Sequence, residues 1–121
     1  MISYTAYKLM HLIGIFMILL SLGGLAIHVF NGGTKQHETR KLLAITHGIG
    51  LALALVAGFG LLARLGISAL EGWVMTKFAI WLVLGSYSII LYRYGKTSKL
   101  HWYVIIALGG TAAFLAQNKP Y

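Results

Sequence analysis

Histidine and lysine are the residues of this chain that could bind a cofactor or move a proton inside an apolar environment. The 121 residues include five histidines and no cysteine, which excludes disulfides, zinc–thiolate sites, iron–sulfur clusters and cysteine nucleophiles. Neutral imidazole remains as a ligand for haem iron or for another transition metal. His11 and His47 both lie inside apolar stretches. An ionisable side chain at such a position indicates a functional site by default.

The spacing around His11 gathers polar and small residues on one helical face. Positions 11, 14, 18, 21, 25 and 28 share a face of an α-helix. They include His11, Gly14, Ser21 and His28. We expect this face to point into a helical bundle. Gly14 then either permits close helix packing or makes room for a flat macrocycle, because both need a missing side chain.

A second stripe surrounds His47 on the next apolar stretch. It contains Arg40, His47, Gly50, Ala54 and Gly58. His47 is therefore a candidate ligand for haem iron, and the alternative is a neutral imidazole that bonds a carbonyl across the bundle. His28 and His101 lie close to the expected helix ends, which makes them secondary candidates and favours solvated side chains.

Lys77 is the one charged residue between positions 72 and 92. Its side chain could reach the membrane interface along its own stem. Alternatively its ammonium meets an anion such as a porphyrin propionate or a lipid headgroup, or the neutral amine acts as ligand or base. The stretch contains no acidic partner. An external anion is therefore favoured, and Lys77 is our candidate catalytic and cofactor-binding residue.

The elements that must position these residues are membrane helices. Apolar residues make up 59% of the chain and charged residues 10%, too few to cover a water-facing surface. A membrane helix needs about 20 apolar residues, and four stretches with at most one charge provide them. We predict an all-α, integral membrane up-down-up-down four-helix bundle, a single transmembrane domain over 1–121. Its helices are expected at about 5–30, 35–65, 69–94 and 98–117.

Short polar segments separate the four stretches. Asn31–Gly33 should end the first helix, and Thr34 should cap the second. Gly66 should close the second helix. Ser68 and Glu71 have the spacing of a capping box, which predicts a third helix starting near residue 69.

The basic residues predict the orientation, because Lys and Arg favour the cytoplasmic side. The first and third connections hold six of them: Lys35, Arg40, Lys41, Arg93, Lys96 and Lys99. The opposite side holds Lys8, Arg64, Lys77 and Lys119. Both termini are therefore expected outside a bacterial-type inner membrane. The net charge of +8 is spread over membrane flanks, with no soluble basic face for nucleic acid.

Folding the chain at these turns predicts which residues share a depth. His11 falls at the level of Ala54, with Lys77 within about one helical turn of it. His47 falls about 10 Å further into the bilayer. That separation is too large for two axial ligands of one iron unless the helices tilt or shift, so His11 is the first candidate ligand.

Two short motifs resemble known membrane families. The segment Tyr7–Gly14 (YKLMHLIG) is similar to the opening of HemJ-type protoporphyrinogen oxidases, and Gly72–Lys77 (GWVMTK) resembles their second signature. The same Trp-to-Lys spacing with a second-helix histidine is similar to SirB-like and CopD-like membrane proteins. The resemblance implies a haem-associated His11, a functional Lys77, haem b as cofactor, and porphyrin or quinone as partner.

These observations predict a membrane-embedded b-type haem protein with a redox role, either electron transfer or tetrapyrrole oxidation. His11 is the expected axial ligand, with Lys77 or His47 opposite. The alternative is a non-enzymatic membrane scaffold or accessory protein whose histidines are structural. Metal-ion handling through His28, His47 and His101 and small-solute transport are further alternatives. A homo-oligomer is left open.

Overall fold

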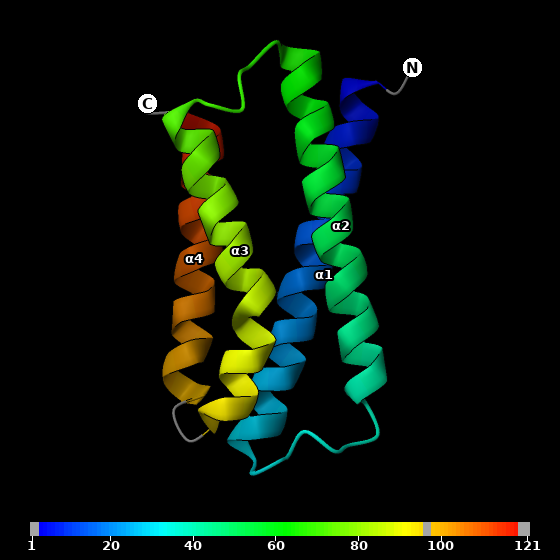
Figure 1. The fold of residues 1–121 in the computed structure, drawn as a ribbon, viewed down its shortest axis with the longest axis vertical. Coiled ribbons are helices and arrows are strands. Elements are labelled where there is room, and N and C mark those ends of the chain that lie inside the picture. Colours follow the sequence, from blue (N-terminus) through cyan, green and yellow to red (C-terminus); the bar gives the residue numbers. More distant parts are fainter. Residues whose placement is uncertain (1–2, 96–97, 119–121) are drawn as a thin grey trace.

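Four α-helices account for nearly all of the protein in the computed structural model, which describes residues 3–95 and 98–118. They are α1 (Tyr4–Phe30), α2 (Arg40–Leu65), α3 (Gly72–Arg93) and α4 (Ser98–Asn118). The described residues contain no strand, which confirms the all-α prediction. Each helix is long and apolar enough to cross a membrane. In Figure 1 the α1–α2 connection and the α2–α3 connection lie at opposite ends of the molecule.

The second helix begins five residues later than predicted. Thr34 does not cap it, because its hydroxyl donates to the backbone oxygen of Gln36. Residues 31–39 instead form a connection of turns and bends, and Thr39 is the N-cap, without a side-chain hydrogen bond. The predicted end of this helix is confirmed, since Gly66 is a C-cap with φ of 68°, in the left-handed region that favours glycine.

The predicted capping box of the third helix is wrong. The Ser68 hydroxyl accepts from the backbone N–H of Leu70, two residues on, so it forms a local turn instead of capping a helix. Glu71 is itself the N-cap residue and α3 starts at Gly72. The helix therefore begins three residues after the predicted position.

The packing is uneven, and α1 has the most extensive contacts with the rest of the molecule. α1 and α2 approach most closely, at Gly14 and Gly50. A Cβ at Gly14 would lie 2.6 Å from the backbone nitrogen of Ala54. By contrast, α2 and α3 contact one another sparsely. The molecule therefore consists of a tight α1–α2 pair, with α3 and α4 packed mainly against each other and against α1.

The core follows the predicted stripe of α1. Gly14, Ile18, Ser21 and Leu25 are buried. Ile18 and Leu25 belong to a core cluster that includes apolar residues of α3 and α4 such as Leu91. Large apolar side chains also cover the outer surface, among them Phe16, Leu20, Val56, Ile89, Ile106 and Phe114. A surface of this kind is compatible with contact to lipid.

Candidate functional site

The imidazole of His11 links α1 to α2. Its Nδ1 lies 2.8 Å from the backbone oxygen of Ala54, the residue predicted to share its depth. A carbonyl oxygen only accepts hydrogen bonds, so Nδ1 carries the proton and Nε2 keeps its lone pair. Gly58 lies against the ring, since a Cβ there would be 3.2 Å from His11 Cε1. α2 thus fixes both the tautomer and the orientation of His11.

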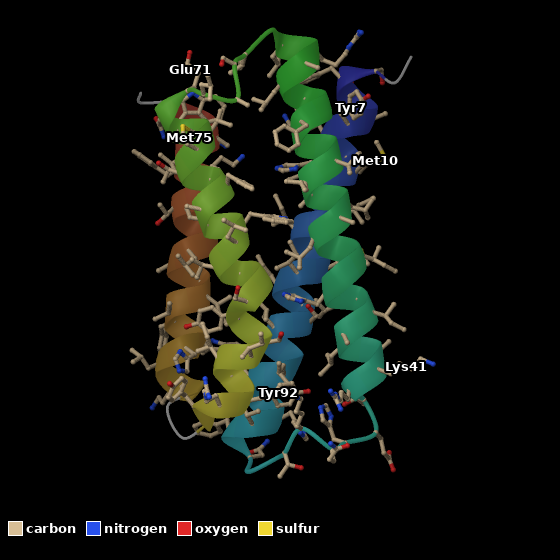
Figure 2. All side chains as sticks on the ribbon, viewed as in Figure 1. Tyr7, Met10, Lys41, Glu71, Met75 and Tyr92 are labelled. Atoms are coloured by element: carbon tan, nitrogen blue, oxygen red, sulfur yellow. The ribbon has the colours of Figure 1, made fainter. Side chains whose placement is uncertain are left out.

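Lys77 of α3 lies close enough to His11 for its charge to act on the imidazole. Both side chains are half-buried. The two residues that the sequence placed first, on α1 and α3, therefore lie within electrostatic range of one another. Figure 2 shows Tyr7 and Glu71 at one end of the molecule, and Lys41 and Tyr92 at the opposite end.

His47 lies elsewhere and links α2 to α3. Its Nε2 donates to the backbone oxygen of Leu84 at 3.0 Å, and the side chain is 8% exposed. One turn further along, Trp81 Nε1 donates to the backbone oxygen of Leu51 at 3.1 Å. These two hydrogen bonds connect the helices that otherwise contact each other sparsely. His47 precedes Ala54 by seven residues, about 10 Å of helix, so His47 and His11 are not brought together.

Gly14, the remaining predicted cofactor contact, lies in the α1–α2 interface. A Cβ there would approach the backbone of both Ala54 and Gly50. These distances support the packing interpretation of Gly14. A cofactor contact at Gly14 stays a prediction.

A cluster at the 31–39 end was not predicted. The rings of His28 and His37 are stacked with centroids 3.7 Å apart, and His28 Nε2 donates to the backbone oxygen of Thr34. His37 Nε2 also lies 2.7 Å from the Tyr92 hydroxyl of α3. Partial burial lowers the pKa of His37 below 6.5, and the nearby His28 and Arg40 lower it further. His37 lies in the connection between α1 and α2, and no helical spacing relates such a residue to α3, so this contact could not be predicted.

His101 of α4 is bonded to Tyr87 of α3, with its Nδ1 2.7 Å from the hydroxyl. His28, His47 and His101 thus belong to three separate contacts. Among the described residues no group of three or more histidine, aspartate or glutamate side chains could hold a metal ion. Within that part of the chain, the geometry gives no support to metal-ion handling through these three residues.

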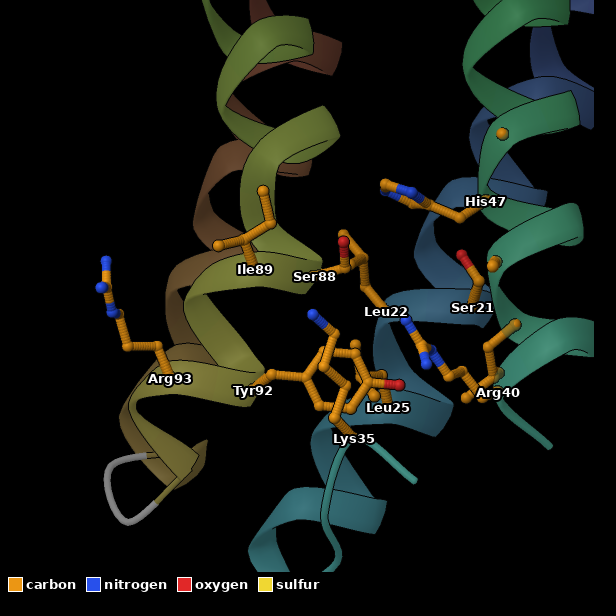
Figure 3. A pocket seen from close by; sticks show the side chains of 13 residues that line it. Ser21, Leu22, Leu25, Lys35, Arg40, His47, Ser88, Ile89, Tyr92 and Arg93 are labelled. Carbon is orange, nitrogen blue, oxygen red and sulfur yellow. The ribbon is translucent and has the colours of Figure 1, made fainter. Parts of the chain in front are cut away.

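A cleft of about 630 Å³ opens between α2 and α3, with α1 as its floor (Figure 3). Three basic side chains line it at the 31–39 end: Lys35, Arg40 and Arg93. Its other polar side chains are Ser21, His47, Ser88 and Tyr92. In the sequence these three cations indicated only the orientation of the helices. The signal that could have revealed the cleft is that Arg40 begins α2 and Arg93 ends α3, at the same end of the bundle.

Comparison with known proteins gives no relative: no family model, curated protein or solved structure matches this chain. The site must therefore be interpreted from its own geometry.

Proposed function

We propose that this chain is an integral membrane protein of a bacterial-type inner membrane and that its four helices cross the membrane in up-down-up-down order. The four apolar helices and the lipid-compatible outer surface support this proposal. The 31–39 end would face the cytoplasm, because six of the ten basic residues flank the helices there. Both termini would then lie outside.

Within that bundle the protein would bind haem b with His11 as axial ligand and serve a redox role, either electron transfer or tetrapyrrole oxidation. The observation that carries this proposal is the hydrogen bond from His11 Nδ1 to Ala54. A metal-bound histidine almost always donates its other ring N–H to a carbonyl or carboxylate, which orients the ring and raises its basicity. That leaves Nε2 of His11 available for iron. In His47, Nε2 is already bonded to Leu84, so ligation through that atom would break the α2–α3 link.

Lys77 completes the proposed site from α3. The electrostatic influence of its charge on the His11 imidazole supports this role. It would hold a propionate as the ammonium, or act as ligand or base as the neutral amine. A bound haem supplies one-electron chemistry, and its apolar surroundings set its potential. A quinone or a porphyrin would be the exchange partner.

An absorption spectrum tests the haem proposal. The protein is expressed with haem supplied, purified from membranes and examined for a Soret band. We expect a band in the unmodified chain, and its loss or a shift to a high-spin form in His11→Ala. His28→Ala, which lies outside the site, is the matched control and should keep the spectrum. A colourless unmodified protein contradicts the proposal, as does a Soret band that survives His11→Ala but not His47→Ala.

A non-enzymatic membrane scaffold or accessory protein is the second candidate. It is favoured by the histidine hydrogen bonds, since His11, His47 and His101 each link two different helices. On this alternative the purified protein is colourless, and each histidine variant lowers the stability of the bundle without a spectroscopic change. Unfolding measured by circular dichroism, beside the absorption spectrum, separates the two candidates.

A further inference from the structure

The α2–α3 cleft carries positive charge that the protein itself does not neutralise. Lys35, Arg40 and Arg93 line one end of it, where α2 begins and α3 finishes. The whole chain has two acidic residues, Glu38 and Glu71. Within the described residues, none of the three basic side chains is paired with either carboxylate. Lys35 and Arg40 extend into the cleft, and Arg93 adds a third positive charge at the same end, with its side chain on the outer side of α3 (Figure 3). This concentration of positive charge favours an anionic ligand, and arginine in particular suits phosphate.

The remainder of the cleft is lined mainly by apolar groups. Leu22 and Leu25 of α1 form its buried floor, and Leu43, Ala44 and Ile89 belong to its walls. Gly48 leaves further room, because nothing lies within 4 Å of the position its Cβ would take. The cleft lies between two helices that contact each other sparsely. This is the shape of a site for a flexible hydrocarbon chain.

Hydrogen-bonding groups lie deeper in the cleft than Lys35 and Arg40. Ser88 precedes Tyr92 by four residues, so it lies about 6 Å deeper along α3. Its hydroxyl forms no hydrogen bond with another described residue. His47 lies across the cleft on α2 (Figure 3). The cations thus lie at one end, while Ser88 and His47 lie deeper, with Leu22 and Leu25 along the floor.

We infer that this cleft binds an anionic phospholipid of the cytoplasmic leaflet, with its phosphate at Lys35 and Arg40 and with Arg93 adding positive charge at the same end. A glycerophospholipid has a group for each part of this lining: a phosphate for the cations, ester carbonyls for the deeper hydrogen-bonding groups and an acyl chain for the apolar floor. The ester carbonyl is an acceptor for the Ser88 hydroxyl, and one acyl chain follows Leu22 and Leu25. The cations lie at helix ends, the depth of the headgroups, and the cytoplasmic leaflet is the anionic one. The inference uses the membrane location proposed above and is independent of haem.

Native mass spectrometry of the detergent-solubilised chain tests the site. The probes are phosphatidylglycerol and phosphatidylcholine with identical acyl chains. The cleft variant is Lys35→Gln/Arg40→Gln/Arg93→Gln. The control variant, Lys8→Gln/Lys41→Gln/Lys99→Gln, removes the same charge from exposed positions outside the cleft.

We expect the unmodified chain to retain phosphatidylglycerol in preference to phosphatidylcholine. The cleft variant should bind phosphatidylglycerol roughly a hundredfold more weakly, because each basic residue near an anionic headgroup contributes about fivefold. The control variant should stay within a few-fold of the unmodified chain. Equal loss in both triple variants, or equal retention of the two lipids, overturns the inference.

A second variant tests the hydrocarbon part without removing charge. Gly48→Phe fills the cleft from a position where the added side chain meets no neighbouring atom at its Cβ. We expect it to lose phosphatidylglycerol while its circular dichroism is unchanged. Gly110→Phe is the matched control, since its Cβ is equally unobstructed and it lies outside the cleft. Retention of the lipid by Gly48→Phe overturns the inference.

Competition distinguishes the sources of the anion. Inorganic phosphate at millimolar concentration should leave the bound lipid in place, and displacement would assign the site to free phosphate. Displacement by hemin would assign the cations to tetrapyrrole propionates. Either result overturns the lipid inference. A chain that does not fractionate with membranes refutes the proposed membrane location, whereas a membrane protein without lipid preference refutes the inference alone.

Discussion

The close approach of Gly14 of α1 to the backbone of α2 yields a sharp prediction for Gly14→Ala. The added methyl group would lie 2.6 Å from the Ala54 nitrogen and 2.7 Å from the Gly50 oxygen, whereas ordinary van der Waals contacts begin at 3.4 Å. Both neighbours are backbone atoms, so no side chain can rotate away. The two helices must move apart instead.

The expected cost follows from that movement. Overpacking of a tight contact destabilises a protein by about 1–3 kcal/mol. Separation of the helices also strains the hydrogen bond from His11 to Ala54, which is worth about 1 kcal/mol in a membrane bundle. Alanine in place of a mid-helix glycine stabilises the folded protein by roughly 0.5–1 kcal/mol, which offsets part of this cost. We therefore expect Gly14→Ala to lower the free energy of unfolding by about 2 kcal/mol.

Gly48→Ala is the matched control, because a Cβ at Gly48 meets nothing within 4 Å. Only the gain in helix propensity applies at Gly48, so the free energy of unfolding of this variant should equal or exceed that of the unmodified chain. Unfolding is followed by circular dichroism while sodium dodecyl sulfate is titrated into a mild detergent. Equal stability of Gly14→Ala and Gly48→Ala would refute the close α1–α2 approach on which the position of His11 depends.

Three further predictions concern charge, helix linkage and topology. A nuclear magnetic resonance titration should give His37 a pKa below 6.5, and this pKa should rise in His28→Ala. Because the pKa of His37 is lowered in the folded state, that state loses stability as the pH falls below 6.5. An unchanged pKa in His28→Ala contradicts the stacked pair. Trp81→Phe should lower the free energy of unfolding by about 1 kcal/mol through its lost hydrogen bond, and His47→Ala by more because it also leaves a cavity. Equal stability of both variants with the unmodified chain would refute the α2–α3 links. Gln36→Cys in this cysteine-free chain should react with an impermeant thiol reagent only from the cytoplasmic side, and labelling from outside would invert the proposed topology.

The sequence was sufficient for the helices and for the depth of His11. Long apolar stretches make spanning helices almost unavoidable, and a fixed rise per residue then places residues that are equally distant from a turn at one level. That is why His11 meets Ala54 as predicted. The buried stripe through Gly14, Ser21 and Leu25 followed from helical periodicity for the same reason.

The first residues of α2 and α3, and the contacts that the connecting segments make, could not be predicted from apolar length and helical rise. A hydroxyl at Thr34 or Ser68 can cap a helix or form a local turn, and the choice depends on the path of the connection. The His28–His37 stack depends on how residues 31–39 fold back over α1. The cleft depends on the distance between α2 and α3, which no pattern within one helix specifies. Side-chain pairs between helices, such as Tyr87 with His101, are hidden for the same reason.

The uneven packing around α1 has a consequence for the order in which the protein is assembled. The ribosome delivers α1 and α2 first, and these two helices form the tightest pair of the molecule. The Gly14 crossing and the hydrogen bond from His11 to Ala54 join only α1 and α2, so this interface can form as soon as α2 has left the ribosome. α3 and α4 then pack mainly against each other and against α1. The cleft marks where the later half of the chain stops short of closing against the amino-terminal helix pair.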